Sequence, residues 1–405
     1  MTGLKATVNK MGQQSIYTKN FKICFIGTFI FSFSFYYLIP VMPVYLEGIG
    51  KSKSEIGIIV GAFFAASIIL RPVVGVTLKK YSNKSLMIIG SAIFALAPAL
   101  YLTTTSGLLL TLIRMFHGMG VAAFMTSAVI MVADTVPRGK LAHATGIYFT
   151  SANVALGIAP LMGSTAGRYF NFAGQMIFLV IAALSVILLL ININEQPQAK
   201  DVYEAKPFWG VLKERDVLIP TFVFVACTFS NGTINAFLPL QTLTWGYHNS
   251  GLYFSVFAVT IVAVRLLGGG LSDSFGRKAV ILPCLVITSL GTMFLALVHT
   301  PLGLAFCAFF YAAGFGLLYP SLNAIIVERA EPENRSTALG IFSTSVDGGQ
   351  FLGPAVMGYV GQYFGFGPMF MTAALAPLTG LLVFLLCLPS AKKGSGFPAP
   401  GRAEK

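Results

Sequence analysis

Charged residues are scarce in this sequence. Of its 405 residues only 10% are charged, whereas 56% are hydrophobic, and the mean hydropathy is +0.78. A soluble globular domain carries about 25% charged residues, because charge covers its surface. A soluble fold is therefore excluded, and most of the exterior is expected to face lipid.

Reactive and metal-binding groups are equally sparse. The five cysteines lie in apolar stretches, with no CxxC pair and no histidine at ligand spacing, so they are expected to be small core residues: Cys24, Cys227, Cys284, Cys307 and Cys387. The sequence has no GxxxxGK[ST] phosphate loop and no nucleophile–base pair in a plausible site. Neither an enzyme nor an ATP-driven pump is indicated, and we expect no cofactor and no metal.

Long apolar runs take the place of the missing charge. About 20 apolar residues suffice for a helix that crosses a bilayer, and twelve such runs are present, near 21–46, 55–78, 85–104, 107–133, 143–167, 173–192, 217–241, 250–271, 279–298, 303–327, 338–363 and 367–388. The first 20 residues are polar and basic, and the first apolar run is too long for a cleaved signal peptide. That run is expected to be the first membrane helix.

The meaning of the formal charge of +13 depends on where the basic residues lie relative to the membrane. If the N-terminus is cytoplasmic, 21 of the 27 Lys and Arg fall on the cytoplasmic side, three lie in outer loops (Lys51, Lys53, Arg168) and three within spans (Arg71, Arg114, Arg265). Such a bias is the positive-inside signature of a membrane protein. It argues against nucleic-acid binding, and it predicts a multi-pass protein of the inner (plasma) membrane with both termini cytoplasmic.

The chain repeats itself at an offset of 194 residues. Residues 144–170 and 338–364 are identical at nine of 27 positions, Pro160 and Pro354 among them, and the same offset pairs Arg71 with Arg265. Homologous parallel six-helix halves with a binding site between them are typical of secondary transporters. We therefore expect bundles over 21–192 and 217–388, a cytoplasmic linker over 193–216, and cytoplasmic tails over 1–20 and 389–405.

These features resemble the major facilitator superfamily over residues 21–388. The resemblance implies an all-α polytopic membrane protein with 12 transmembrane helices in two pseudo-symmetric six-helix bundles, which transports by alternating access. The fourth span contains LIRMFHGMG, similar to the RxxxG element of drug:proton antiporters, and the eleventh contains GQFLGPAVMG, similar to their glycine–proline stripe. The chain is accordingly most like the bacterial drug:proton antiporter or efflux branch.

The loop between the eighth and ninth spans, GGGLSDSFGRK, is similar to the gating-loop motif of that family. Asp273, Arg277 and Lys278 are expected to latch a helix end to the neighbouring bundle. The equivalent loop of the first half has Lys79 in place of the acid, which weakens any latch on that side. The alternative is a loop whose charges only set topology.

Arg114 lies well inside the fourth span, where a guanidinium is costly unless it faces water or a partner. We expect it to face a central cavity, although a long side chain that reaches the outer interface is the alternative. His117, one turn further on, is a candidate proton shuttle or a packed polar residue. Arg71 and Arg265 are expected to share a structural task at the inner ends of their helices.

Asp347 is the only acidic residue near the middle of a span, and its repeat mate is the neutral Asn153. A buried carboxylate beside an arginine can exchange a proton as its surroundings change. Asp347 is thus predicted to couple protons with help from Arg114, unless it is a structural acid paired with Arg114, Arg265 or backbone donors.

By analogy with the family, spans one, four, seven and ten line the cavity. With His117 and Asn153, the candidate contacts are Tyr36, Tyr37, Asn231, Asn235, Gln241, Tyr319 and Asn323. The predicted function is proton-coupled efflux of a small organic molecule by a functional monomer in the lipid bilayer. The rivals are a proton symporter or facilitator for an anionic metabolite, with the span arginines as binding groups, and a non-transporting receptor or assembly subunit.

Overall fold

The computed structural model describes residues 16–77, 81–136, 140–194 and 208–387. Within these ranges the regular structure is entirely helical, and twelve helices have at least 18 residues. Six precede the expected linker and six follow it. This arrangement confirms the expected all-α, twelve-helix architecture.

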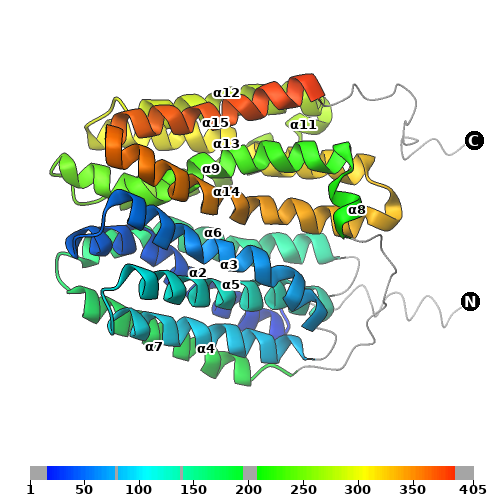
Figure 1. The fold of residues 1–405 in the computed structure, drawn as a ribbon. Coiled ribbons are helices and arrows are strands. Elements are labelled where there is room, and N and C mark those ends of the chain that lie inside the picture. The colour runs from blue at the N-terminus through cyan, green and yellow to red at the C-terminus, as the bar shows by residue number, and fades with distance from the viewer. Residues whose placement is uncertain (1–15, 78–80, 137–139, 195–207, 388–405) are drawn as a thin grey trace, which may run out of the picture.

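The first bundle contains α2 to α7, drawn from blue to green in the lower part of Figure 1. Their bounds are Lys19–Gly48 for α2, Lys53–Thr77 for α3, Asn83–Tyr101 for α4, Gly107–Thr135 for α5, Leu141–Ala166 for α6 and Phe172–Ile191 for α7. Helix α2 packs on α6, and α5 packs on both α3 and α4.

The second bundle lies above the first in Figure 1. Its long helices are α9 (Arg215–Thr244), α10 (Gly251–Gly268), α12 (Arg277–Phe294), α13 (Pro301–Arg329), α14 (Arg335–Phe364) and α15 (Phe366–Cys387). The short helices α8 (Phe208–Leu212) and α11 (Leu271–Ser274) and the 3₁₀ turn η2 (Pro332–Asn334) connect them. Helix α8 falls inside the range expected to be the linker, of which 195–207 lies outside the described residues.

Eleven of the twelve long helices are apolar enough to span a membrane by length and composition, and α14 is the exception. It carries Asp347 and Gln350 among many Ser, Thr and Gly residues. Helix α14 packs against α9 of its own half and α3 of the other. Because this helix is wedged between protein neighbours, it needs less lipid-facing apolar surface than the others.

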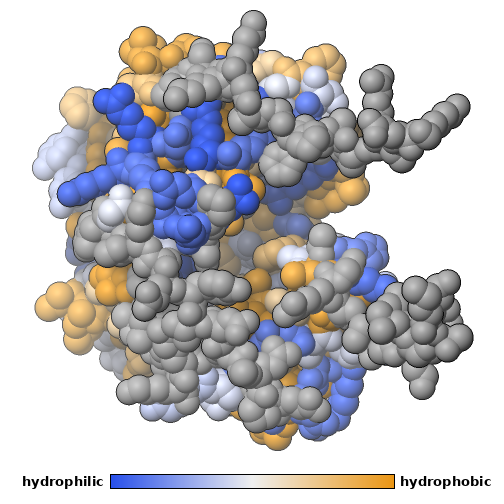
Figure 2. All heavy atoms as spheres, turned by 90° about the vertical axis from the view of Figure 1, so that its right-hand side faces the viewer, coloured by the Kyte–Doolittle hydropathy of each residue, from blue (hydrophilic) through white to orange (hydrophobic). Residues whose placement is uncertain are grey.

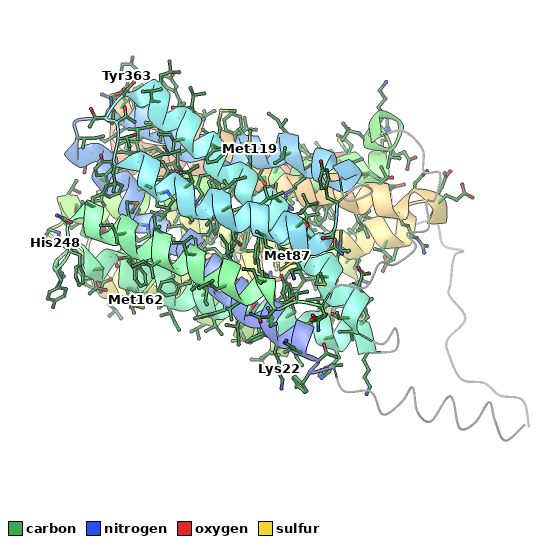
Figure 3. All side chains as sticks on the ribbon, turned by 90° about the horizontal axis from the view of Figure 1, so that it is seen from below. Lys22, Met87, Met119, Met162, His248 and Tyr363 are labelled. Carbon is green, nitrogen blue, oxygen red and sulfur yellow. The ribbon has the colours of Figure 1, made fainter. Side chains whose placement is uncertain are left out.

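Consecutive long helices run in opposite directions, and most of the basic residues at their ends lie at one end of the molecule. We call this end, where α2 begins and α15 finishes, the basic end; it carries Lys22, Lys84, Arg277 and Arg329. Lys22 lies towards this end in Figure 3, whereas His248 and Tyr363 lie at the other. The other end is called the opposite end.

The two bundles meet along two seams that the repeat relates. Helix α3 packs on α14 and, equivalently, α10 packs on α6. A Cβ on Gly57 would lie 2.0 Å from the Pro354 carbonyl oxygen, and one on its repeat mate Gly251 would lie 2.3 Å from Leu161 Cα. Glycine is therefore required at both positions, since only a residue without a side chain permits this close approach.

Hydrogen bonds also join the bundles at the opposite end. Ser255 Oγ donates to the Gly157 carbonyl at 2.6 Å, and Ser164 Oγ donates to Asn249 Oδ1 at 2.8 Å. At the basic end, Figure 2 shows a notch between the two bundles. Close contacts thus join the bundles at the opposite end, where both bundles also line a surface pocket, and the notch makes the basic end the more open of the two.

Candidate functional site

An ion pair joins the bundles in the middle of the first seam. Arg71 Nε of α3 donates to Asp347 Oδ2 of α14 at 2.6 Å, and Ser67 Oγ of α3 donates to the same oxygen at 3.0 Å. Asp347 is only 4% exposed, whereas the Arg71 side chain retains 27% exposure. The carboxylate is therefore enclosed by protein and satisfied from the other bundle.

This pairing corrects the expected one. The sequence pattern put Arg114 beside Asp347 and gave Arg71 a structural task at a helix end, but the partner is Arg71. Ser67, the other donor, was missed because a serine within an apolar span carries no signal of its own. The sequence does not show that α3 contacts α14. Ser67 and Asp347, which meet there, are 280 residues apart in the chain.

Three of the predicted cavity residues lie near the seam arginines Arg71 and Arg265. The Arg265 guanidinium of α10 interacts electrostatically with the Tyr36 and Tyr319 hydroxyls, and Tyr319 also interacts with Arg71 and contacts Asn323. The Tyr319 ring stacks on Phe342 with centroids 5.1 Å apart. Tyr319 and Asn323 line a pocket that extends to Arg277 and Glu328 at the basic end. Residues of α2, α3, α10, α13 and α14, from both halves, thus contribute to one polar region.

Arg265 has no carboxylate partner among the described residues. Its Nε donates to the Gly316 carbonyl at 3.1 Å, and its side chain is exposed. Arg265 and Arg71 are repeat mates, but the position equivalent to Asp347 is Asn153, which is half-buried on α6. The two seams therefore share their backbone packing and differ in charge.

Arg114 occupies a separate place in α5. It is 5% exposed, its guanidinium carbon lies 4.8 Å from the centroid of the Phe63 ring, and it contacts the Tyr101 hydroxyl. Its Nε has no hydrogen-bond partner. This burial contradicts the alternative in which Arg114 extends to the outer interface.

A small pocket connects Arg114 with the second half. It is lined by Arg114 and by Asn235 of α9, with apolar residues of α2 and α3 between them. Asn235 Nδ2 donates to Gln350 Oε1 at 2.9 Å and to Asn231 Oδ1 at 3.3 Å. The predicted contacts Asn231 and Asn235 therefore form an amide cluster, to which the structure adds Gln350.

Three other predicted contacts lie inside the bundles. The Tyr37 hydroxyl donates to Gln175 Oε1, His117 Nδ1 lies 3.0 Å from the Tyr101 hydroxyl, and Gln241 Nε2 donates to the Leu295 carbonyl. All three are 3% exposed or less. Their bonds fit packing roles, since each stays within its own half.

The gating-loop residues form contacts within the second half. Arg277 binds Asp273 at 2.5 Å and Glu328 at 2.6 Å, and it donates to Ser272 Oγ. Lys278 is half-exposed beside it. The expected latch to the neighbouring bundle is thus wrong for this conformation, because both acids belong to the same bundle. Lys79 lies outside the described residues.

The first half keeps this contact with an amide in place of the guanidinium. Asn83 and Asp134 are the repeat mates of Arg277 and Glu328, and Asn83 Nδ2 donates to Asp134 Oδ2 at 3.1 Å. The repeat therefore preserves the contact between two helix ends while exchanging an ion pair for an amide–carboxylate bond.

Two six-helix bundles that join at one end, are separated by a notch at the other, and both contribute to one polar region have the architecture of a membrane transporter. The family model of the Major Facilitator Superfamily matches residues 24–244 and 220–405. The chain belongs to this family.

Individual relatives agree with that assignment. The chain is 25% identical over 366 residues to the multi-drug resistance efflux pump PmrA homolog of Lactococcus lactis, covering 84% of this chain and 89% of the relative. It is 22% identical over 396 residues to the staphylopine export protein of Staphylococcus aureus, covering 92% and 98%. Among solved structures, the nucleoside transporter NupG matches with a TM-score of 0.79 at 15% identity, covering 91% of this chain and 98% of that one. Within the family, the chain resembles the drug-efflux branch.

Proposed function

We propose that this transporter exports a small organic molecule in exchange for protons, with Asp347 as the proton carrier. The supporting observation is the ion pair across the bundle interface, in which Asp347 is enclosed and Arg71 is its partner. Asp347 is the one carboxylate placed mid-span in the described residues. Intramembrane carboxylates are costly and generally serve a function.

The charge of Asp347 would then depend on which end is open. With the basic end open, Arg71 stabilises the ionised carboxylate, which favours release of its proton there. Movement of α3 away from α14 would leave a buried carboxylate without its cation, which favours proton uptake from the other side. Proton binding and the exchange between the two access states are coupled through this pair.

The relatives support the proposed direction of export, and the orientation is compatible with it. The positive-inside rule assigns the basic end to the cytoplasm, so cargo would enter from the cytoplasm in the conformation described above. Relatives named as an efflux pump and an export protein support the same direction. We propose a protein of the plasma membrane that works as a monomer, because each chain contains both halves of the path.

Everted membrane vesicles test the proposal. Respiration acidifies their interior, so an antiporter accumulates cargo in exchange for protons, and addition of cargo restores the fluorescence of acridine orange. A panel of anionic, cationic and neutral aromatic compounds identifies a transported probe. We expect uptake in the wild type, loss of gradient-driven uptake in Asp347→Asn, and normal uptake in Asp216→Asn, which removes an acid that is paired with Arg329 at the basic end.

Other outcomes have clear meanings. Gradient-driven uptake that persists in Asp347→Asn contradicts the proposed role of Asp347. Counterflow that is unaffected by a proton gradient in the wild type identifies a facilitator, and accumulation in right-side-out vesicles with an acid exterior identifies a symporter.

A further inference from the structure

We propose that the cargo is an organic anion, and that its carboxylate, phosphate or sulfonate group binds Arg114 in the pocket between the two bundles. This inference rests on the transport function proposed above, because it assigns a chemical class to the transported molecule. It follows from the charges within the spans and from the surroundings of one buried guanidinium.

The spans of the described residues contain more cations than anions. Arg71, Arg114 and Arg265 lie within them, and Asp347 is the single mid-span carboxylate. Asp347 is engaged by Arg71. Two guanidinium groups therefore remain in the membrane interior without an acidic partner from the described part of the protein.

Arg114 is the less well compensated of the two. It is 5% exposed, yet its Nε has no hydrogen-bond partner. The Phe63 ring and the Tyr101 hydroxyl are neutral, so they stabilise the guanidinium without cancelling its charge. Buried charges in proteins are generally paired, and an unpaired arginine is suited to a bidentate bond with a carboxylate or phosphate.

The pocket beside Arg114 is small, with a volume of about 20 Å³ in this conformation, so it admits the charged group of a cargo and not its apolar body. Its wall consists of Phe35, Leu38, Ile39 and Phe64, and Asn235 contributes a polar atom from the second half. Binding sites for small molecules typically combine apolar walls with a few placed polar groups. Since the two halves supply Arg114 and Asn235 separately, a change in their relative position would alter the affinity for the cargo.

Arg265 extends the positive region towards the open end. Its side chain is exposed, and its Nε donates to a backbone carbonyl rather than to an acid. A positive charge in a cleft with apolar walls raises the local concentration of anions. The two arginines without an acidic partner therefore leave a positive charge that an anionic cargo would neutralise.

Binding to the purified full-length protein tests the class of cargo directly. Three probes share a naphthalene skeleton and differ in charge: naphthalene-2-carboxylate, naphthalene-2-carboxamide and 2-naphthylmethylammonium. A ligand that binds the folded state raises the Tm in a concentration-dependent way. We expect the carboxylate to raise the Tm and to bind at least tenfold more tightly than the amide or the ammonium probe.

Matched variants locate the group responsible. Arg114→Gln should weaken carboxylate binding at least tenfold, Arg114→Lys should restore part of it, and Arg265→Gln should weaken it several-fold. Arg168→Gln removes one positive charge from an exposed position at the opposite end and should leave binding unchanged. Because Arg265 is exposed, its variant keeps the test informative even where Arg114→Gln does not fold.

Several results overturn the inference. The first is that the wild type binds the carboxylate probe no more tightly than the other two probes. The second is that Arg114→Gln keeps the preference for the carboxylate, and the third is that Arg168→Gln loses it. Loss of proton coupling in vesicles with intact, Arg114-dependent carboxylate binding contradicts the proposed antiport alone. Gradient-driven transport of the cationic probe contradicts the anionic class alone.

Discussion

Arg71 Nε and Asp347 Oδ2 lie 2.6 Å apart across the interface between the two bundles. Both residues have repeat mates, Arg265 and Asn153, and only one of the two equivalent positions on α6 and α14 carries an acid. The mid-span carboxylate is therefore present once in a molecule whose backbone packing is present twice. Such asymmetry allows one seam to respond to protonation while the other keeps the bundles in register.

A double-mutant cycle should measure how strongly this pair holds the bundles together. Arg71→Gln leaves an enclosed carboxylate without its cation, so it should cost about 1–3 kcal/mol of stability, less than a fully buried pair because Arg71 is partly exposed. Asp347→Asn should cost less, because the remaining arginine can reach solvent. The double variant should regain part of the loss, with a coupling energy of about 1 kcal/mol or more.

The readout for this cycle is thermal unfolding in detergent at neutral pH. The i, i+4 pair Lys51–Glu55, whose charged atoms lie 3.6 Å apart and whose carboxylate side chain is 46% exposed, is the control, and its cycle should give no more than about 0.5 kcal/mol. Additive losses for Arg71→Gln and Asp347→Asn would show that the two side chains do not depend on each other.

Glycine at positions 57 and 251 should be essential for closing the opposite end. A Cβ at either position meets backbone atoms of the other bundle, which cannot move aside without separating the helices. Gly57→Ala and Gly251→Ala should therefore favour the conformation in which the opposite end is open, and transport should fall at least tenfold. Single cysteines at this end, labelled from outside in intact cells, report the opening.

Gly340→Ala is the matched control for both glycine variants. Gly340 lies in α14, and a Cβ at this position would have no neighbouring atom within 4 Å. Alanine should therefore leave transport normal and raise helix stability slightly. Unchanged labelling in Gly57→Ala and Gly251→Ala would mean that the seam adapts without opening.

The helices and the halves were predictable because their signals are local or repeated. Apolar runs predicted all twelve spans, including the one in α14, which is not apolar enough to count as a span by composition, and the offset of 194 residues pairs that run with 144–170. The expected span 338–363 lies within the observed Arg335–Phe364. Repeat symmetry thus supports the prediction of the helix with the weakest apolar signal.

The partners of the charged residues were not predictable in the same way. Arg71 and Asp347 stood out separately, as a symmetric basic residue and as the central acid, but their contact depends on how two bundles dock. Arg277 was identified from its motif, whereas no sequence pattern singled out its acceptor Glu328, at the end of α13. Contacts between distant segments require the packing, which no local pattern contains.

The Arg277–Glu328 contact should matter more for the transport cycle than for stability. Both side chains are partly exposed, at 24% and 52%, and exposed pairs contribute about 0–1 kcal/mol. Glu328→Gln should therefore lower the Tm by only a few degrees. Transport should fall several-fold, because Arg277 also binds Asp273 and connects α11, α12 and α13.

Asp273→Asn provides the comparison within the same cluster. It should reduce transport to a similar extent, since either acid fixes the same guanidinium. A large fall in Tm together with normal transport in Glu328→Gln would instead identify the contact as purely structural.

His117 should not determine the pH dependence of transport. Its ring is 1% exposed, its Nδ1 lies 3.0 Å from the Tyr101 hydroxyl, and it packs against Phe63 and Phe94 inside the first bundle. His117→Gln should lower the Tm, because the lost packing should cost about 1–3 kcal/mol of stability. The pH profile of transport should keep its midpoint, whereas Asp347→Asn should abolish the profile. A shifted midpoint in His117→Gln, together with a normal pH profile in Asp347→Asn, would indicate that His117 of α5 couples protons instead of Asp347 of α14.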